Sequence, residues 1–461
     1  MKFVDRLNEM ATLDNEYRRD GASFVVVYGR RRVGKTELIR YFIKDKSAIY
    51  FLATEESEAM NREAFKRQVA DYLNDELLRE AVVDRWDLIF EKLVSSSNSQ
   101  RTVIVIDEFQ YIGKNNPAFL SVFQRVWDNL LSKENVMVIL CGSLVSMMMS
   151  QTLNYDAPLY GRRTAQIRLR PISFEYYNEF FDSNYSEEEL VKRYSLTGGV
   201  PKYIEMFQNS SDLQNAIKNS LLNVSSFLFD EPNFLLQKEV SDIGSYFSIL
   251  RVIAEGNHKI SNIAGLIQQK QTNLPRYLNV LIDLDLLERE VPVTEKNPDK
   301  SKKGQYQIRD NFLRFWFRFI YPNLSYLEIS HSDVVLNLLS KNFVDGHVSY
   351  VYEQICQEKL WTLSAKGLLP GLLERVGRWW DNSHEIDVVG LSEKDDLLVV
   401  GECKFWKGPV GSNILYQLEQ KTTFVEWHKD SRKIIYVIFS VNGFTDALKA
   451  VANVREDVML I

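Results

Sequence analysis

The sequence predicts an α/β protein of about three domains, and three observations carry this prediction. The chain has 461 residues, which is too many for one continuous core at roughly 100–200 residues per domain. In its first third, short apolar and β-branched runs alternate with longer stretches of helical character, which is typical of a parallel sheet covered on both faces. Hydrophobic residues make up 45% and charged residues 26% of the chain, which argues against a disordered or collagen-like protein.

The first two regions differ in their patterns. Residues 1–170 are expected to contain the parallel sheet, with strands at 24–28, 48–52, 102–106 and 136–140 and helical stretches at 36–44, 57–95 and 117–132. Residues 171–235 have a helical pattern that the Gly-Gly-Val-Pro sequence at 198–201 must interrupt.

Two further regions follow. Residues 236–322 are predicted to form helices near 242–254, after the N-cap Ser261 and near 273–287, then a polar loop at 294–303 and a strand at 305–308. Three helices followed by a loop between extended segments is the pattern of a winged helix. The aromatic run Phe312–Tyr321 is predicted as a core helix. Residues 332–461 are predicted to contain a helical stretch at 332–360, strands at 385–390, 397–404 and 433–439, and a helix at 412–428.

Charge and cysteine content indicate the surroundings of the protein. The net charge of −6 argues against a surface coated in positive charge for nucleic acid, although a local basic patch is compatible with it. The three cysteines, Cys141, Cys356 and Cys403, are widely spaced and flanked by apolar residues, which favours reduced thiols in the cytoplasm. No stretch reaches about 18 uncharged apolar residues and the first residues lack an apolar signal core, so we expect neither secretion nor membrane spanning.

A phosphate-binding motif follows the first predicted strand. Residues 29–36 match G-x-x-x-x-G-K-[ST] at every fixed position. Glycines let the backbone wrap the phosphates, while the lysine reaches the outer phosphates and the hydroxyl ligates Mg²⁺. We expect the motif and the residue after it to bind nucleotide: Gly29, Arg30, Arg31, Arg32, Val33, Gly34, Lys35, Thr36 and Glu37.

Two more predicted strands end in polar residues. The apolar strand at 102–106 delivers Asp107 and Glu108, as a Walker B motif does, so Asp107 is predicted to hold Mg²⁺ and Glu108 to polarise the attacking water. The strand at 136–140 ends at Cys141-Gly142-Ser143, which puts the small polar side chain of Ser143 beside the expected γ-phosphate. An ordinary strand-ending turn is an equally good interpretation of that segment.

These residues together resemble a family of P-loop ATPases first recognised widely in archaea, within the AAA+/STAND group. Similar to that family are Phe3-x-x-Arg6-x-x-Glu9 ahead of the P-loop, the two Walker motifs, the sensor turn at 141–143, the segment 158–163 and Leu196–Tyr203. The resemblance implies an ASCE-type ATPase with a helical lid over 171–235, a lid residue, Pro201, at the nucleotide, and a sensor role for Ser143. It also implies an arginine finger, Arg162 or Arg163, acting in its own subunit or on a neighbour. Alternatively, both arginines are exposed surface charges.

The last region carries a second acidic constellation. In a strand, residues i and i+2 share a face, so Glu402 and Lys404 point the same way. A facing Asp387 would complete a pocket for Mg²⁺, with Lys404 orienting water. This arrangement is similar to the PD-(D/E)XK nuclease superfamily, which has a restriction-endonuclease-like α/β fold. The resemblance adds Glu353 as an extra metal-binding acid and Tyr416-Gln417 as an accessory helix motif. The alternative is a hairpin with solvated charges.

The middle region offers positive charge. The expected loop at 294–303 has a net charge of +2, from four lysines against Glu295 and Asp299, which suits phosphate contacts. Winged helices also act as protein adaptors, and the third helix looks more like core than like a reader of bases. The residues concerned are Lys270, Arg276, Lys296, Lys300, Lys302 and Lys303 for DNA, and Leu278, Leu281, Leu284 and Leu286 for the core.

The sequence therefore predicts a cytoplasmic, Mg²⁺-dependent ATPase. ATP and Mg²⁺ are its expected cofactors, and its nucleotide state is expected to gate a nuclease-like domain at 332–461 that acts on or binds DNA. The alternative is a non-cleaving STAND-type signalling or scaffold ATPase, whose last domain binds a protein partner or a second copy of the chain.

Overall fold

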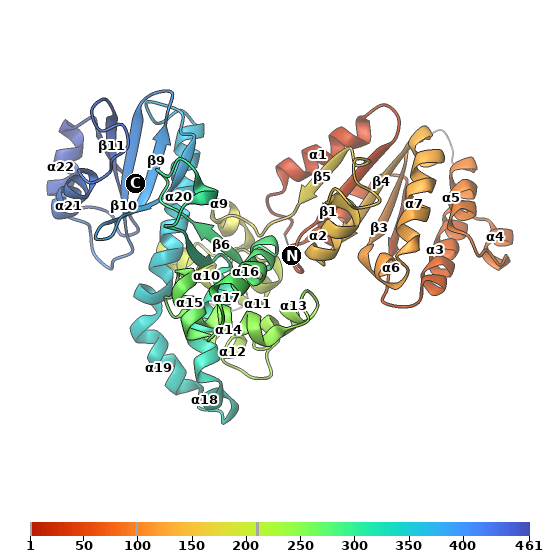
Figure 1. Cartoon of the computed structure of the whole chain (residues 1–461), viewed down its shortest axis with the longest axis horizontal. Coiled ribbons are helices and arrows are strands. Elements are labelled where there is room, and N and C mark those ends of the chain that lie inside the picture. The colour runs from red at the N-terminus through yellow and green to blue at the C-terminus, as the bar shows by residue number, and fades with distance from the viewer. Residues whose placement is uncertain (1, 97–99, 209–211) are drawn as a thin grey trace. The chain divides into compact units, whose positions relative to one another are not determined.

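The computed structural model describes residues 2–96, 100–208 and 212–461. The chain forms two compact units, one mainly N-terminal and one mainly C-terminal (Figure 1). Unit 1 comprises residues 1–172 with two short later segments, 200–202 and 233–241, and unit 2 comprises 173–199, 203–232 and 242–461. The finer division of the second unit into lid, winged helix and nuclease-like domain stays a prediction.

Unit 1 is built on a parallel five-stranded sheet in the order β2-β3-β4-β1-β5. Its strands are β1 (Ser23–Tyr28), β2 (Ala48–Leu52), β3 (Thr102–Asp107), β4 (Val136–Gly142) and β5 (Ala165–Arg168). The four predicted strands are confirmed. The sequence did not predict β5, because this edge strand has only four residues and alternates with polar Gln166 and Arg168.

Helices cover this sheet. They are α1 (Leu7–Arg18), α2 (Lys35–Ile43), α3 (Glu58–Leu73), α4 (Glu76–Glu80), α5 (Trp86–Ser95), α6 (Gln110–Asn115), α7 (Ala118–Asn129) and α8 (Val145–Met148). The helical stretch predicted at 57–95 consists of three helices. It breaks where Asn74 adopts a left-handed conformation, with φ of 52°, and the Asp75 side chain accepts the Leu78 N–H to begin α4. Strands β1, β3 and β4 are buried along their whole length, so the sheet is the core of the unit.

Unit 2 begins with helices α9 (Phe174–Tyr177), α10 (Glu187–Thr197), α11 (Pro201–Gln208), α12 (Leu213–Ser220) and α13 (Glu231–Gln237), of which α11 and α13 extend into unit 1 segments. The predicted break is confirmed, since Gly198 and Gly199 both have positive φ and separate α10 from α11. The next elements are α14 (Ile243–Ala254), α15 (Ile260–Leu266), α16 (Leu274–Asp283) and the antiparallel strands β6 (Leu287–Glu290) and β7 (Gln305–Ile308).

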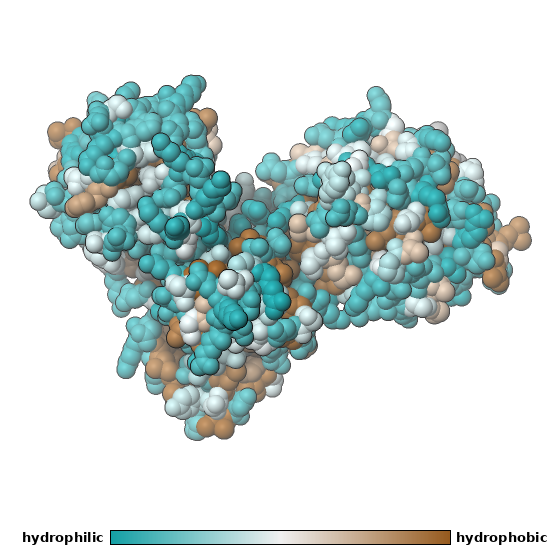
Figure 2. Space-filling model, in the orientation of Figure 1, coloured by the Kyte–Doolittle hydropathy of each residue, from teal (hydrophilic) through white to brown (hydrophobic). Residues whose placement is uncertain are grey.

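The aromatic run after β7 is buried helix, as predicted. It consists of α17 (Asn311–Phe315) and a π-helical stretch at Trp316–Ile320, in which Phe312, Trp316 and Phe317 are inaccessible or nearly so. Helices α18 (Leu324–Glu328), α19 (Ser332–Phe343) and α20 (Ser349–Ala365) follow. Figure 2 shows apolar surface over α18 and α19, to which Tyr326, Ile329, Val334 and Leu338 contribute exposed side chains.

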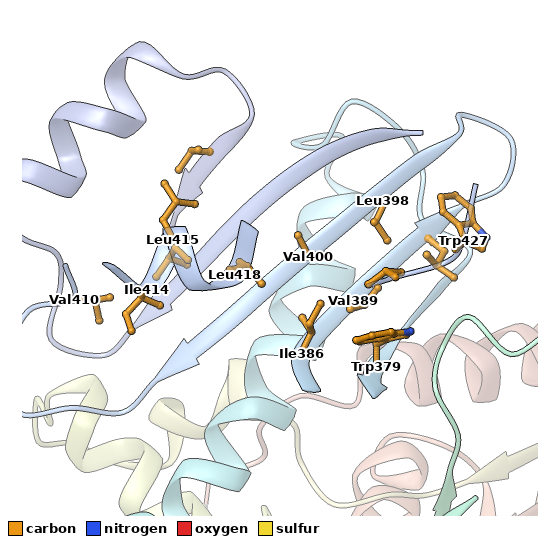
Figure 3. Close-up of a cluster of buried hydrophobic side chains, with 14 of the residues drawn as sticks. Trp379, Ile386, Val389, Leu398, Val400, Val410, Ile414, Leu415, Leu418 and Trp427 are labelled. Atoms are coloured by element: carbon orange, nitrogen blue, oxygen red, sulfur yellow. The ribbon is translucent and has the colours of Figure 1, made fainter. Parts of the chain in front are cut away.

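The last part of unit 2 is a mixed five-stranded sheet in the order β12-β11-β10-β9-β8. It contains β8 (Arg375–Trp380), β9 (Glu385–Ser392), β10 (Leu397–Lys404), β11 (Lys433–Ser440), β12 (Val458–Leu460), α21 (Ser412–Thr422) and α22 (Asp446–Val454). The three predicted strands are confirmed, β8 and β12 are additional, and α21 ends six residues before the predicted 428. Figure 3 shows the core, in which Ile386, Val389 and Val400 from β9 and β10 face Ile414 and Leu418 of α21.

The three cysteines are free and buried, as expected for structural thiols. Within residues 2–96, 100–208 and 212–461, no helix combines the length and apolar character that crossing a bilayer requires.

Candidate functional site

The predicted phosphate-binding loop joins β1 to α2. Gly29 has φ of 154°, and a Cβ there would lie 2.3 Å from the backbone oxygen of Leu169, which follows β5. Gly34 has φ of 95° and immediately precedes α2. Both positions therefore demand glycine, and the loop delivers its backbone N–H groups to the start of α2, where an anion is stabilised.

Lys35 is buried inside this loop. Its Nζ donates to the backbone oxygens of Gly29 and Arg30, both at 2.8 Å. Burial lowers the pKa of Lys35, and the nearby Glu108 and Asp107 carboxylates partly offset that shift. These carbonyl oxygens accept the hydrogen bonds that phosphate oxygens would accept in a bound nucleotide, and the phosphate-binding role of Lys35 stays a prediction.

The predicted Mg²⁺ ligands already touch each other. The Thr36 hydroxyl, at the start of α2, donates to Oδ2 of Asp107 at the end of β3, at 3.0 Å. The Tyr50 hydroxyl, on β2, donates to the same oxygen. Asp107 is buried, so one hydroxyl and one carboxylate converge in a site of the hard oxygen ligands that Mg²⁺ prefers.

Glu108 meets the predicted sensor residue. Its backbone is left-handed, with φ of 53°, and its Oε2 accepts the Ser143 hydroxyl at 2.8 Å and the Gln110 amide. Ser143 comes directly after β4, the neighbour of β3 in the sheet. The structure therefore brings together the two residues that the sequence assigns to water activation and γ-phosphate sensing.

Arg6 supports the phosphate-binding loop through hydrogen bonds to the backbone. Its Nη2 donates to the backbone oxygens of Val33, at 2.9 Å, and of Arg170, at 2.8 Å. The motif at residues 3–9 was noted in the sequence only by resemblance, and the structure adds its physical reason. Tyr50 and Gln110 were not predicted as site residues, because one buried tyrosine on a strand and one glutamine after Walker B carry no spacing signal.

The other predicted nucleotide-binding residues surround the same loop. Arg30 is buried, Arg31 donates to the Tyr111 hydroxyl at 2.9 Å, and Arg32 adopts φ of 71°. The Cγ of Pro201 lies 3.9 Å from the position that a Cβ on Gly34 would take. Glu37 is exposed in the first turn of α2.

The two candidate finger arginines have different surroundings. Arg162 forms a two-pronged ion pair with Asp128 of α7, at 2.8 Å to each carboxylate oxygen, and also donates to the backbone oxygen of Pro158. Arg163 lies over the ring of Tyr160, at 5.8 Å from its centroid. Asp128 therefore already occupies the planar donor face of Arg162.

The second constellation converges on β9 and β10. Oδ2 of Asp387 accepts the backbone N–H of Cys403 at 2.9 Å, so this carboxylate lies beside the residue between Glu402 and Lys404. Nζ of Lys404 donates to Glu402 at 2.8 Å. Burial raises the pKa of Asp387 and repulsion by Glu402 raises it further, while the Cys403 N–H and Lys404 act in the opposite sense.

Glu353, the predicted extra acid, lies near the other acids, whereas the predicted accessory motif Tyr416-Gln417 is exposed. Glu353 lies on α20, with a carboxylate oxygen 3.7 Å from Nε of Arg378 on β8. Burial raises the pKa of Glu353 and proximity to Asp387 raises it further, so both acids belong to one buried cluster. Tyr416 and Gln417 of α21 are exposed, and no contact with the acids is recorded for either.

Lys421, one turn further along α21, was not predicted. Its Nζ reaches both carboxylate oxygens of Glu402, at 3.0 and 3.1 Å. Glu402 thus has two lysine partners, one from its own strand and one from the helix. In the residues that the structure describes, no group of three or more His, Cys, Asp or Glu side chains is arranged to hold a metal ion.

A P-loop after strand β1 of a parallel sheet, with Walker B acids on β3 and strand β4 between the two, defines the class of P-loop ATPases. Residues 3–207 match the model of an ATPase domain predominantly from Archaea, and residues 316–421 match a model of archaeal and bacterial proteins of unknown function. The chain is 35% identical to "Uncharacterized protein MJECL04" of Methanocaldococcus jannaschii over 405 residues, and this aligned region covers 88% of each chain. The chain therefore belongs to the family of that protein, and it contains both an ATPase domain of predominantly archaeal type and a domain of unknown function.

Two solved structures resemble parts of the chain. The Walker-type ATPase PABY2304 of Pyrococcus abyssi has a TM-score of 0.49 and 19% identity, covering 68% of this chain and 96% of its own. The ORC2 protein of Aeropyrum pernix, solved with ADPNP and ADP, has a TM-score of 0.45 and 13% identity, covering 70% of this chain and 95% of its own.

Proposed function

We propose that the protein is an Mg²⁺-dependent ATPase whose nucleotide state controls a nuclease-like C-terminal domain that acts on or binds DNA. The observation that carries this proposal is the convergence of Asp387, Glu402 and Lys404 on one point of β9 and β10. Family membership gives the ATPase half, and this acidic point supports the other half.

At the ATPase site, Lys35 and the loop N–H groups would hold the phosphates, and Thr36 and Asp107 would hold Mg²⁺. A bound Mg²⁺ ion would supply positive charge that neutralises the phosphates. Glu108, held by Ser143 in this structure, would orient the attacking water once that hydroxyl turns away. Arg163 is the better finger candidate because Asp128 engages Arg162.

At the C-terminal site, the donor set suits a divalent cation. Asp387 and Glu402 are carboxylates held close enough to repel each other, which a cation between them would relieve. Lys404 would stabilise negative charge that develops on a phosphodiester. The bound metal would supply a polarised water as nucleophile.

A winged helix formed by α14, α15, α16 and the β6–β7 hairpin would supply the contact with DNA. Leu278 and Leu281 of α16 are fully buried, which agrees with their predicted core role. Exposed basic residues would make the phosphate contacts, although Lys303 is paired with Glu295 in this structure: Lys270, Arg276, Lys296, Lys300, Lys302 and Lys303.

A second function is favoured by one specific observation. Both Lys404 and Lys421 pair with Glu402, so internal ammonium groups occupy the carboxylate that a metal would need. Such pairing suits a degenerate site in a non-cleaving signalling or scaffold ATPase. The exposed apolar side chains of α18 and α19 would then serve a protein partner or a second copy of the chain.

Cleavage assays separate the two functions. The purified protein with ATP and Mg²⁺ is incubated with single-stranded, duplex and branched DNA, beside Lys404→Ala, Asp387→Asn and the control Lys407→Ala, which removes an exposed lysine of the same domain. Cleavage by the wild type and the control alone supports the nuclease. Absence of any product with all three DNAs favours the scaffold. In parallel, Lys35→Ala should abolish ATP hydrolysis, and persistent hydrolysis would refute the P-loop assignment.

A further inference from the structure

A short segment between α13 and α14 is packed into the ATPase unit. Residues 233–241 belong to unit 1, although the chain on both sides of them belongs to unit 2. Directly after this segment, Asp242 caps α14, the first helix of the proposed winged helix. Any movement of residues 233–241 is therefore transmitted through only a few bonds to unit 2.

Glu239 fastens this segment to the sensor turn. Its Oε1 accepts the backbone N–H of Val145 at 3.0 Å, and its Oε2 accepts the Ser146 hydroxyl at 2.7 Å. Both oxygens of one carboxylate are thus committed to the start of α8. Ser143, two residues before Val145, is the residue whose hydroxyl contacts Glu108.

Lys238, the preceding residue, contacts the loop on the other side of β3. Nζ of Lys238 lies 2.6 Å from Oε1 of Glu55, in the loop that follows β2. In the sheet, β2 and β4 are the two neighbours of β3, and all three strands are parallel. The loops after β2 and β4 therefore flank the end of β3 that carries Asp107 and Glu108. We call residues 238–239 the clasp.

We propose that the clasp couples the nucleotide state of the Walker B site to unit 2, with Glu239 as a positioning residue for the sensor turn. Ser143 has one hydroxyl proton, so it can donate either to Glu108 or to a nucleotide phosphate. The turn at 143–146 thus has two hydrogen-bonded arrangements, and Glu239 contacts the part of it that must shift between them. This proposal rests on ATP binding at the P-loop.

The coupling has a necessary consequence for affinity. If nucleotide changes how firmly Glu239 holds the turn, then removal of Glu239 must change how firmly the protein holds nucleotide. A ligand that makes no difference between the two arrangements shifts nothing. A residue that merely capped α8 would stabilise both arrangements equally and would leave nucleotide affinity unchanged.

Hydrogen exchange of the full chain tests the clasp. The variants are Glu239→Gln, which keeps the shape but loses one acceptor, Lys238→Met, and the control Glu328→Gln, which alters an exposed acid of unit 2. Without nucleotide, Glu239→Gln should speed exchange in residues 145–148 about tenfold, the loss expected for a hydrogen bond to a charged acceptor. Unchanged exchange there would refute the contact itself.

The second measurement addresses coupling. In the wild type and in Glu328→Gln, a non-hydrolysable ATP analogue should alter exchange in residues 238–250, and in Glu239→Gln this difference should disappear while analogue affinity changes by about threefold or more. Equal affinity and an equal exchange difference in Glu239→Gln would overturn the proposal. If the wild type failed to bind the analogue, both the ATPase assignment and the coupling proposal would be wrong. If the wild type binds the analogue and hydrolyses ATP but shows no exchange difference in residues 238–250, only the coupling proposal is wrong.

Discussion

Lys421 provides the sharpest test of what the C-terminal acids are for. Its Nζ lies 3.0 and 3.1 Å from the two oxygens of Glu402, whose side chain is only 9% exposed. At 3.0 Å and an effective dielectric constant of about 20, the attraction is about 5 kcal/mol. Lys421 is 30% exposed and Lys404 still pairs with the same carboxylate, so we expect Lys421→Met to cost about 1–2 kcal/mol of unfolding free energy without Mg²⁺.

Mg²⁺ should reverse that cost if the acids form a metal site. Removing Lys421 removes a competing positive charge, so Mg²⁺ should bind the variant about tenfold more tightly than the wild type and restore its stability. Urea unfolding in EDTA and in Mg²⁺ measures both effects. The matched control is Lys429→Met, which breaks an exposed pair with Glu426 in the same domain and should cost at most about 0.5 kcal/mol with no Mg²⁺ dependence. A Lys421→Met protein that is destabilised equally in EDTA and in Mg²⁺ would refute the metal site.

Two further predictions concern stability. Gly29→Ala should lower the free energy of unfolding by about 2 kcal/mol or more and abolish ATP binding, because its Cβ would collide with the Leu169 oxygen. The control Gly161→Ala, at a φ of 77° but in open space, should lower it by about 1 kcal/mol. Equal shifts in the melting temperatures of the two variants would contradict this steric argument. Burial and the neighbouring Glu290 raise the pKa of Glu288 to about 7, so the folded protein holds a proton there that the unfolded chain releases, and stability falls as pH rises from about 4.5 through 7. Glu288→Gln should therefore be more stable than the wild type by about 3 kcal/mol at pH about 8 and by nothing near pH about 4, since each unit of pKa difference is worth about 1.4 kcal/mol. A gain at pH 8 no larger than at pH 4 in urea unfolding would contradict the shift.

The sequence predicted those features that depend on neighbours along the chain. The P-loop and Walker B residues were found because their spacing is local, and strand periodicity located β9 and β10. The sequence did not predict strand β5, because the strand is defined by its pairing with β1 across the sheet and not by its own composition. Lys421 escaped for a similar reason: which residue of α21 faces Glu402 depends on how the helix packs against β10. Gln417 of the accessory motif precedes Lys421 by one turn of α21, and both Tyr416 and Gln417 are exposed.

Both candidate sites share one physical feature. In each, another group of the chain contacts a residue that we propose as catalytic: loop carbonyls accept from Lys35, Ser143 donates to Glu108, and Lys421 pairs with Glu402. A ligand must break these contacts before it gains its own. Its apparent affinity is therefore its intrinsic affinity multiplied by the fraction of molecules in which the contacts are already broken, which we call the open form. Any contact that favours the open form of one site therefore raises affinity there without touching the ligand. We propose that the clasp at residues 238–239 biases this equilibrium at the ATPase site, because Glu239 holds the sensor turn and the chain continues directly into unit 2.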